Sequence, residues 1–372
     1  MKFLFVVQGE GRGHMTQAIA LHQILTRQGH EICAVMVGRS RSRMIPEFLV
    51  KRIAAPISSF WSPNFKVDAK RRGVSVIGTA TDNLIRLPAF ARSIVALRRA
   101  VRLYEPDVIV NLFEPLTAIY RTLWRPKPKM VCIAHQYLML HPEFLFPPEL
   151  RIARWALLAY TRLTSWGADM RLALSFRAMP DFPKRKLTVT PPLMRAEVKT
   201  LKATTQDFIL AYVLNDGYAD ELAASHRSCP DIKVLGFWDR QGVPEIFQLQ
   251  QNMTFQQLDD IAFLDAMSRC RGLISTAGFE SICEAMYLGK PVYMVPVKNQ
   301  IEQHCNAIDA CQAGAGQWGF EFDVTRLQEC IEGHPGESEE FRRWADSAES
   351  VFADLLTRVV ADDPNSRSRM NS

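Results

Sequence analysis

Short apolar runs alternate with helix-like stretches along nearly the whole chain. A segment with helical spacing, residues 15–29, joins the first two runs and ends at Gly29. Short continuous apolar runs separated by helices are typical of parallel strands that are buried on both faces. The first half of the chain is therefore predicted to form strands at 2–7, 31–38, 107–113, 130–135 and 171–176.

A second series of the same kind follows an interruption in the pattern. Pro191 and Pro192 precede a polar stretch, and we interpret residues 194–206 as a linker. The last helical stretch, 338–360, has Ser338 as its expected N-cap. Beyond the linker, strands are predicted at 207–214, 232–238, 271–278 and 291–297.

The two series predict the fold class α/β, with two doubly wound Rossmann-like domains that face each other across a cleft. Ligands of such sheets bind at the carboxyl ends of the strands. The predicted parts are an N-terminal domain at 1–193, the linker at 194–206, a C-terminal domain at 207–340, a helix at 341–361 that packs back toward the first domain, and a disordered tail at 362–372.

The composition excludes a disordered chain and a small disulfide-rich scaffold. The chain has 372 residues, 48% of them hydrophobic, which is enough for two domains with their own cores. No apolar run reaches the ~18 residues that span a bilayer. The apolar start leads straight into a glycine-rich turn, so we expect a first strand and not a signal peptide. The eight cysteines contain no C-x-x-C pair, which favours free thiols in a cytoplasmic protein over disulfides or zinc.

Charge is divided unevenly between the two halves. Residues 1–200 carry 31 Lys and Arg against 13 Asp and Glu, a net charge of +18; residues 201–372 carry 14 against 26, a net charge of −12. A basic half suggests an anionic partner such as a membrane surface, a nucleic acid or a phosphorylated substrate. A solvated basic face with no partner is the alternative. No recognised nucleic-acid-binding motif accompanies the charge, so no nucleic-acid partner is expected.

A glycine-rich turn with a histidine directly follows the first strand. Its spacing, Gly9-Glu10-Gly11-Arg12-Gly13-His14, is G-x-G-x-G rather than the G-x-G-x-x-G of dinucleotide-binding folds, and no acid ends the second strand. Gly11, Arg12 and Gly13 are therefore candidates for an acceptor or phosphate loop at a helix N-terminus. The positive end of that helix keeps the His14 imidazole neutral and able to accept a proton. An exposed cap residue is the alternative for His14.

A second glycine junction lies at 275–285, between a strand and a helix. Gly278 and the helix N-terminus are expected to hold a diphosphate, with hydroxyls from Thr276 and Ser281. Glu284, about one turn into the helix, is placed to accept the vicinal hydroxyls of a ribose. The next strand is followed by the pair Glu302-Gln303.

These motifs resemble the donor-binding region of GT-B-fold glycosyltransferases. The resemblance is to the bacterial peptidoglycan lipid-intermediate N-acetylglucosaminyltransferases and to UDP-glycosyltransferases, and the Gly9–His14 turn is similar to the first glycine loop of these families. It implies an acceptor-binding first domain and a second domain that binds a nucleotide sugar. By the same resemblance, Glu302 and Gln303 would bind the donor sugar, the backbone at Leu258 would read the base, and Phe279 would lie at the diphosphate site.

The chain departs from these families in three places. Thr276 stands where many members have a histidine, and Glu302 stands where they have an aspartate. The first loop of the second domain, 213–218, lacks the usual double glycine. Asn215 and Gly217 are the expected phosphate contacts there.

The implied reaction is sugar transfer from a UDP-sugar to a hydroxyl, with inversion and without a metal or other cofactor. His14 would act as the base, and the helix that begins near Phe279 would stabilise the departing diphosphate. No D-x-D element follows a strand, so no metal is expected. Glu114 is the candidate acid that orients His14, with Glu10 as its rival. His135 ends another strand and either lines the acceptor site or has a structural role.

The segment 84–104 is basic and amphipathic. Phe90, Leu97 and Val101 fall on one face at helical spacing, and arginines project from the other sides. Such a surface suits an anionic membrane, and hence a lipid-linked or membrane acceptor at the inner face of the membrane. The alternative is that the apolar face packs on the sheet.

Two other functions remain open. One is an epimerase of the same architecture that acts on UDP-N-acetylglucosamine, and the other is a non-catalytic partner that binds a sugar nucleotide or a lipid. The transferase hypothesis requires that His14 point into the space between the domains and that Glu284 be accessible to a ligand.

Overall fold

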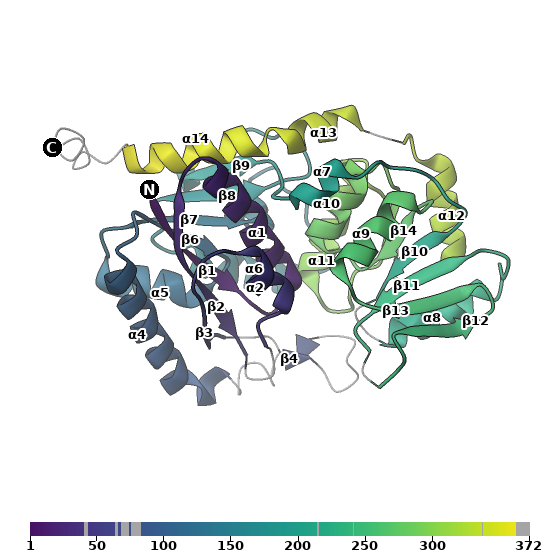
Figure 1. Cartoon of the computed structure of the whole chain (residues 1–372), viewed down its shortest axis with the longest axis horizontal. Helices are drawn as coiled ribbons and strands as arrows, with labels where there is room; N and C mark the ends of the chain where they lie inside the picture. Colours follow the sequence, from purple (N-terminus) through teal and green to yellow (C-terminus); the bar gives the residue numbers. More distant parts are fainter. Residues whose placement is uncertain are drawn as a thin grey trace.

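The computed structural model of the chain describes residues 1–40, 44–63, 66–67, 74–75, 83–213, 216–240, 242–336 and 338–361. The predicted disordered tail, 362–372, lies outside these residues. The described chain forms two lobes, each built around a mainly parallel seven-stranded sheet (Figure 1). This arrangement confirms the predicted α/β class with two doubly wound domains. No helix in the described ranges is both long and apolar enough to cross a membrane.

The sheet of the first lobe is parallel, with the strand order β3-β2-β1-β6-β7-β8-β9. In the interior strand β1, Val6 pairs with Met36 on β2 and with Asn111 on β6. All five predicted strands are present, and the structure adds β3 and β9 at the two edges. The strands are β1 (Lys2–Gln8), β2 (Glu31–Arg39), β3 (Ile57–Trp61), β6 (Val108–Leu112), β7 (Lys129–Ala134), β8 (Met170–Leu174) and β9 (Leu187–Thr190).

Helices cover both faces of this sheet. Phe5 faces a core shared with the first helix, whereas Leu4 and Val6 face the core on the other side, as the two-residue period of a strand requires. A short antiparallel ribbon, β4 (Lys66–Val67) and β5 (Val74–Ser75), completes the strands of the first half. The helical elements are α1 (Arg12–Arg27), α2 (Glu47–Arg52), α4 (Leu87–Tyr104), α5 (Pro115–Trp124), η1 (His135–Leu140), α6 (Arg151–Thr164) and η2 (Pro183–Arg185).

The amphipathic segment 84–104 forms α4, and its apolar face packs inward. Phe90, Leu97 and Val101 are buried in one core with the side chain of Leu4 on β1. The sheet-packing alternative is therefore correct for this face. Its arginines remain on the outer side, where Arg98 lies over the ring of Trp124.

The second lobe has the strand order β12-β13-β11-β10-β14-β15-β16, in which only β12 is antiparallel to its neighbour. The four predicted strands are present. The structure adds the β12–β13 hairpin and β16, again toward the edges. The elements are α7 (Ala196–Thr200) in the predicted linker, β10 (Ile209–Tyr212), α8 (Asp216–His226), β11 (Val234–Trp238), β12 (Ile246–Gln250), β13 (Met253–Gln257), α9 (Asp260–Arg269), β14 (Leu273–Ser275), α10 (Phe279–Tyr287), β15 (Val292–Met294), α11 (Ile301–Gln312), β16 (Gly316–Trp318) and α12 (Val324–Gly333).

The C-terminal helical stretch is split in two. Ser338 caps the first part, α13 (Glu339–Asp346), because its Oγ accepts a hydrogen bond from the N–H of Phe341 at 3.2 Å. The second part, α14 (Ala348–Ala361), follows after Ser347. α13 contacts α10 of the second lobe, whereas α14 contacts α1, β7 and β9 of the first lobe (Figure 1). One apolar core, which includes Phe5, Ala285 and Phe352, runs through both lobes.

Candidate active site

The glycine turn after β1 brings the start of α1 against the second lobe. Gly9 is fixed to β2 because its N–H donates to the carbonyl of Gly38 at 2.7 Å. Gly11 is the N-cap of α1, and Gly13 faces the carboxyl group of Glu280 so closely that any Cβ at position 13 would collide with it. The glycine at 13 therefore leaves room for the Glu280 side chain, which would otherwise have to move.

His14 lies at this contact and is half-buried. Its Nδ1 is 3.2 Å from Oε1 of Gln17, and its ring stacks on Phe113 with 5.6 Å between the ring centroids. Its Nε2 is 3.5 Å from Nε2 of Gln136, a residue of η1. Enclosure away from water lowers the His14 pKa to about 4, so the imidazole is neutral at physiological pH. His14 is thus flanked by Gln17 and Gln136, and both of these side chains hydrogen-bond to the second lobe.

Two glutamines of the first lobe, one on each side of His14, donate hydrogen bonds to carboxyl groups of the second lobe. Gln17 Nε2 donates to Glu280 Oε1 at 2.5 Å, and Gln136 Nε2 donates to Glu302 Oε1 at 3.0 Å. Burial raises the pKa of each carboxyl group to about 7. Near neutral pH, both groups can therefore hold or release a proton.

The raised carboxyl pKa values predict a pH dependence of stability. In the unfolded chain Glu280 and Glu302 lose their protons near 4.5, whereas in the folded protein they do so near 7. Between these values the folded state holds more protons, so the free energy of unfolding should fall as pH rises through this window. His14 acts in the opposite direction, since its lowered pKa makes stability rise with pH between about 4 and 6.5.

The contribution of the two carboxyl groups can be isolated by substitution. In the double variant Glu280→Gln/Glu302→Gln, the decrease in unfolding midpoint between about pH 5 and pH 8 should be smaller than in the wild type. Thermal melts across that range measure it, with the exposed Glu329→Gln as control. An unchanged pH slope in the double variant would contradict the assignment.

Further polar contacts close the interface between the lobes. Arg12 pairs with Asp260 at 2.5 Å, and Arg177 pairs with Asp309 at 2.8 Å. Arg12 was expected in an acceptor or phosphate loop, but its guanidinium is bound to a carboxylate instead. Side chains of the two lobes thus meet directly at the predicted cleft.

Glu284 is not accessible to a ligand in this structure. Its side chain is 2% exposed, and its two carboxylate oxygens each accept a hydrogen bond at 2.7 Å from Nε and Nη2 of Arg195. Arg195 is itself buried and precedes α7 in the linker. The expectation that Glu284 is open to a ribose is therefore wrong for this conformation, because a guanidinium occupies the carboxylate.

At the tip of α10 the backbone has the geometry expected of an anion site, whereas the predicted side chains do not. Gly278 is the N-cap, and the first N–H groups of a helix lack partners within it. The hydroxyl of Ser281 donates back to the carbonyl of Gly278 at 3.2 Å, and Thr276 is buried. The two hydroxyls were predicted to bind a diphosphate, but in this structure neither of them faces a ligand site.

Phe279 and His135 form a stacked pair between the lobes. Their rings are 4.1 Å apart at 19°, and Phe176 packs on Phe279 from the first lobe. His135 is buried, with Nδ1 at 2.8 Å from the carbonyl of Leu174 and Nε2 at 3.9 Å from Oδ2 of Asp309. The structural alternative for His135 is therefore correct, since it packs inside the interface and does not line an open acceptor site. The ring of Phe279 is likewise occupied by protein contacts.

Glu114 does not orient His14. It is fully buried as the N-cap of α5, where its carboxyl oxygens accept hydrogen bonds from Ser62 Oγ at 2.5 Å and from the N–H and Oγ1 of Thr117 at 2.9 and 3.1 Å. Its rival Glu10 accepts from the N–H of Ser40. The amide of Gln17 is the group that contacts His14 Nδ1.

Of the remaining predicted donor contacts, Gln303 and the N–H of Leu258 are engaged within the protein. Gln303 is buried, and its Oε1 accepts from the N–H of Val297 at 2.8 Å, so that oxygen supports a loop and does not face a sugar. The N–H of Leu258 donates to the carbonyl of Trp238 at 2.9 Å, so it is not free to read a base. Gly217 lies in the first turn of α8, and Asn215 lies outside the described residues.

Sequence reasoning missed Gln17, Gln136, Glu280 and Arg195 as site residues. Gln17 follows His14 by three residues on a helix, a spacing that places two side chains on one face, so that signal was present. Glu280 precedes Glu284 by four residues on α10 in the same way. Nothing local in the sequence marks Arg195 as the partner of Glu284.

Comparisons with known proteins agree with this architecture. The family model described as glycosyl transferase family 1 matches residues 1–335. The chain is 21% identical over 380 residues to a UDP-N-acetylglucosamine--N-acetylmuramyl-(pentapeptide) pyrophosphoryl-undecaprenol N-acetylglucosamine transferase of Histophilus somni, covering 97% of each chain. It is 25% identical over 350 residues to an uncharacterized glycosyltransferase of Methanosarcina acetivorans, covering 85% of this chain and 83% of the relative.

A solved structure shows the same fold at lower sequence identity. Phytolacca americana UGT2, complexed with UDP-2fluoro-glucose and pterostilbene, superposes with a TM-score of 0.65 at 14% identity, covering 97% of this chain and 99% of that chain. The resemblance seen in the two glycine motifs is thereby confirmed. The chain belongs to glycosyl transferase family 1, and it is a glycosyltransferase with the two-lobed GT-B fold.

Proposed function

We propose that this glycosyltransferase moves a sugar from a UDP-sugar to a hydroxyl of a lipid-linked acceptor, with inversion and without a metal, at the cytoplasmic face of a membrane. The observation that carries the proposal is a neutral His14 on α1, whose neighbour Gln17 binds Glu280 at the start of α10 in the second lobe. The names of two similar proteins support the donor and the acceptor class. One is a transferase whose name includes UDP-N-acetylglucosamine and pyrophosphoryl-undecaprenol, and the other was solved with UDP-2fluoro-glucose.

His14 is suited to act as the base. The Gln17 amide nitrogen donates to Glu280, so the Gln17 oxygen faces His14 and accepts the proton on Nδ1. The lone pair is then on Nε2, which faces Gln136 of the same lobe. An acceptor hydroxyl that replaces this long contact would transfer its proton to Nε2 as its oxygen bonds to the anomeric carbon.

The backbone of α10 is suited to the leaving group. The bond between the anomeric carbon and the diphosphate oxygen breaks on the face opposite the incoming oxygen, which inverts the configuration. The negative charge passes to the nucleoside diphosphate, where the N–H groups of the first turn of α10 stabilise it. Glu280 lies in that turn, and its pKa of about 7 allows it to be protonated, which limits its repulsion of the diphosphate.

Donor binding requires a rearrangement at Glu284. The hydroxyls of a ribose can donate hydrogen bonds to this carboxylate only after Arg195 has left it. For a donor to reach Glu284, the Arg195–Glu284 pair would have to open, together with the direct contacts between the lobes.

The donor class is tested by thermal shift and turnover with UDP-, GDP-, ADP- and dTDP-sugars. Stabilisation by UDP-sugars, and release of UDP only when an acceptor is present, are the expected results. Turnover should be unchanged by EDTA, because the helix tip replaces a cation as the electrostatic partner of the diphosphate.

Two results would contradict the proposal. Absence of a shift with any UDP-sugar would exclude the donor. Conversion of UDP-N-acetylglucosamine to an epimer without acceptor would favour the epimerase alternative.

A further inference from the structure

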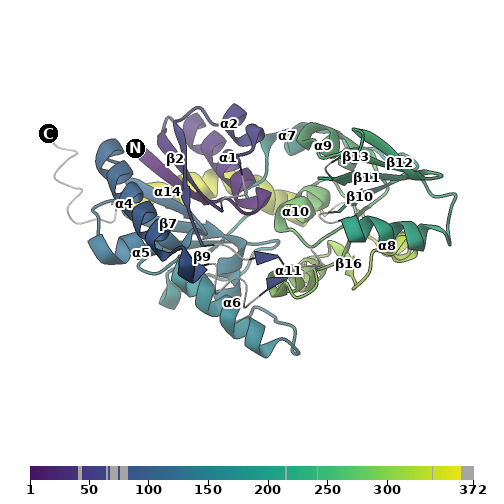
Figure 2. The same ribbon diagram turned by 90° about the horizontal axis from the view of Figure 1, so that it is seen from below.

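Helix α6 connects the active site to the outer surface of the first lobe. On its inner side, the ring of Tyr160 meets Phe113 edge-on, with 5.6 Å between centroids, and Phe113 stacks on His14. α6 also contacts α11 of the second lobe, and Figure 2 shows it along the edge of the molecule beside that helix. A ligand bound on α6 would therefore lie close to the acceptor side of the lobe interface.

The outer side of α6 carries exposed apolar side chains in its first half. Ile152 is 86% exposed and Trp155 is 72% exposed, and Leu145 and Trp166, just before and after the helix, are exposed as well. Large apolar and aromatic side chains on an accessible helix face indicate an interaction surface. Nothing in the described part of the chain covers these side chains.

The charge of α6 is entirely basic. Its sequence contains Arg151, Arg154 and Arg162 and no Asp or Glu. All three arginines are exposed, and on a helical projection Arg151 and Arg162 lie beside Trp155, along one edge of the apolar strip. Arginine beside tryptophan and aliphatic residues is the composition of helices that lie on an anionic bilayer.

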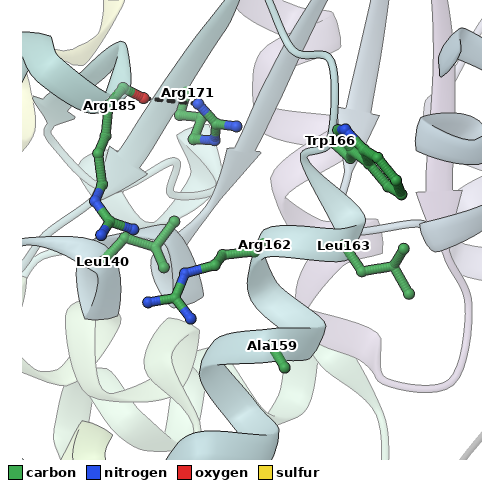
Figure 3. A pocket seen from close by; sticks show the side chains of 7 residues that line it. All are labelled: Leu140, Ala159, Arg162, Leu163, Trp166, Arg171 and Arg185. Atoms are coloured by element: carbon green, nitrogen blue, oxygen red, sulfur yellow. Dashed lines mark hydrogen bonds between the residues drawn. The ribbon is translucent and has the colours of Figure 1, made fainter.

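A hollow of about 600 Å³ opens next to this face (Figure 3). Arg171 is held by Ser165 and by the carbonyl of Arg185, so its role is structural. The side chains of Arg162 and Arg185 make no hydrogen bond or ion pair with any residue that the structure describes, which leaves two guanidinium groups for an anion. The lining residues are Leu140, Ala159, Arg162, Leu163, Trp166, Arg171 and Arg185.

We propose that the outer face of α6 and this hollow dock on a bilayer that contains anionic lipid, with a headgroup phosphate between Arg162 and Arg185. Charge complementarity selects this partner, because the face combines unpaired guanidinium groups with exposed Trp155 and Ile152 and has no acidic residue on its helix. The role of this docking, which is to bring a lipid-linked acceptor to His14, rests on the proposed function. The docking itself does not.

The outer side of α4 and α5 is the competing surface. Leu103 and Leu123 are exposed there, and the sequence predicted a membrane contact in this region. It lies at the end of the first lobe that is remote from the second lobe (Figure 1), so an acceptor delivered there would be far from the lobe interface. The location of α6 beside the interface favours α6.

Vesicle co-sedimentation of the full-length chain tests the docking. Phosphatidylcholine vesicles are compared with vesicles of phosphatidylcholine and phosphatidylglycerol in equal amounts, without donor or acceptor. The wild type should bind the anionic vesicles only. Ile152→Ser/Trp155→Ser should weaken this binding roughly tenfold or more, and Arg162→Gln/Arg185→Gln should weaken it by about fivefold per arginine.

Two matched variants serve as controls. Leu103→Ser/Leu123→Ser changes the competing surface, and Phe320→Ser removes an exposed aromatic residue of the second lobe; both should bind as the wild type does. Thermal melts verify that every variant is folded. Because no substrate is present, failure of transfer activity and failure of docking are separate results.

Three outcomes of the vesicle experiment would overturn the proposal. These are wild-type protein that binds neither kind of vesicle, α6 variants that bind as well as the wild type, and binding lost from the Leu103→Ser/Leu123→Ser variant instead. Conversion of a dimer to a monomer by the α6 substitutions, measured by light scattering, would also overturn it, because a second copy would then be the occupant of this face.

Discussion

Replacing His14 by Asn is expected to lower kcat for sugar transfer by about 10²- to 10⁴-fold, the usual contribution of a general base. The affinity for the donor should change little, because His14 belongs to the first lobe and the proposed donor site to the second. Asn keeps a polar group of similar size but cannot accept a proton at neutral pH. Steady-state transfer kinetics and donor titration by calorimetry measure the two effects.

The control for this prediction lies on the same helix. His22→Asn alters a histidine about two turns further along α1, and it should leave kcat unchanged. Gln17→Met removes the contact to Nδ1 while it keeps the volume, so it should lower kcat by less than His14→Asn does. A His14→Asn enzyme with normal turnover would exclude His14 as the base.

Replacing Glu284 by Ala is expected to lower the free energy of unfolding by about 3–5 kcal/mol, the cost of leaving one partner of a buried ion pair alone. Arg195 is 7% exposed, and Glu284 is its bidentate partner. Removing the carboxylate leaves a buried guanidinium without a counter-charge. Urea unfolding followed by tryptophan fluorescence measures the change.

A double variant distinguishes charge from packing. Arg195→Met/Glu284→Leu removes both charges and keeps apolar volume, so it should recover most of the lost stability. Glu329→Gln, which breaks an exposed pair with Arg326 on α12, serves as the surface control and should leave the unfolding midpoint unchanged. A Glu284→Ala variant as stable as the wild type would show that the pair does not hold the linker against α10.

The apolar pattern predicts the central strands well because their burial on both faces leaves a continuous signal. β1 and β6 are examples, with side chains buried along nearly their whole length. Edge strands lack this signal. In β3 only Phe60 is buried, and in β12 no residue is, so both resemble loops when the sequence is read alone.

The site was predictable where one local motif defines the geometry. A glycine turn that opens a helix fixes the position of His14, and Gly278 fixes the tip of α10. The partners of these groups come from distant segments. Arg195 reaches Glu284 across 89 residues of sequence, and Gln136 reaches Glu302 across 166, and no spacing rule relates them.

The chain crosses between the lobes twice, once through the linker at α7 and once at Ser347 between α13 and α14. Both crossings lie along the same margin of the molecule, at the top of Figure 1. Two bodies joined at two points can rotate freely only about the line through those points. The line through α7 and Ser347 is thus the hinge axis of the protein, and the lobes can separate only on the side opposite this axis.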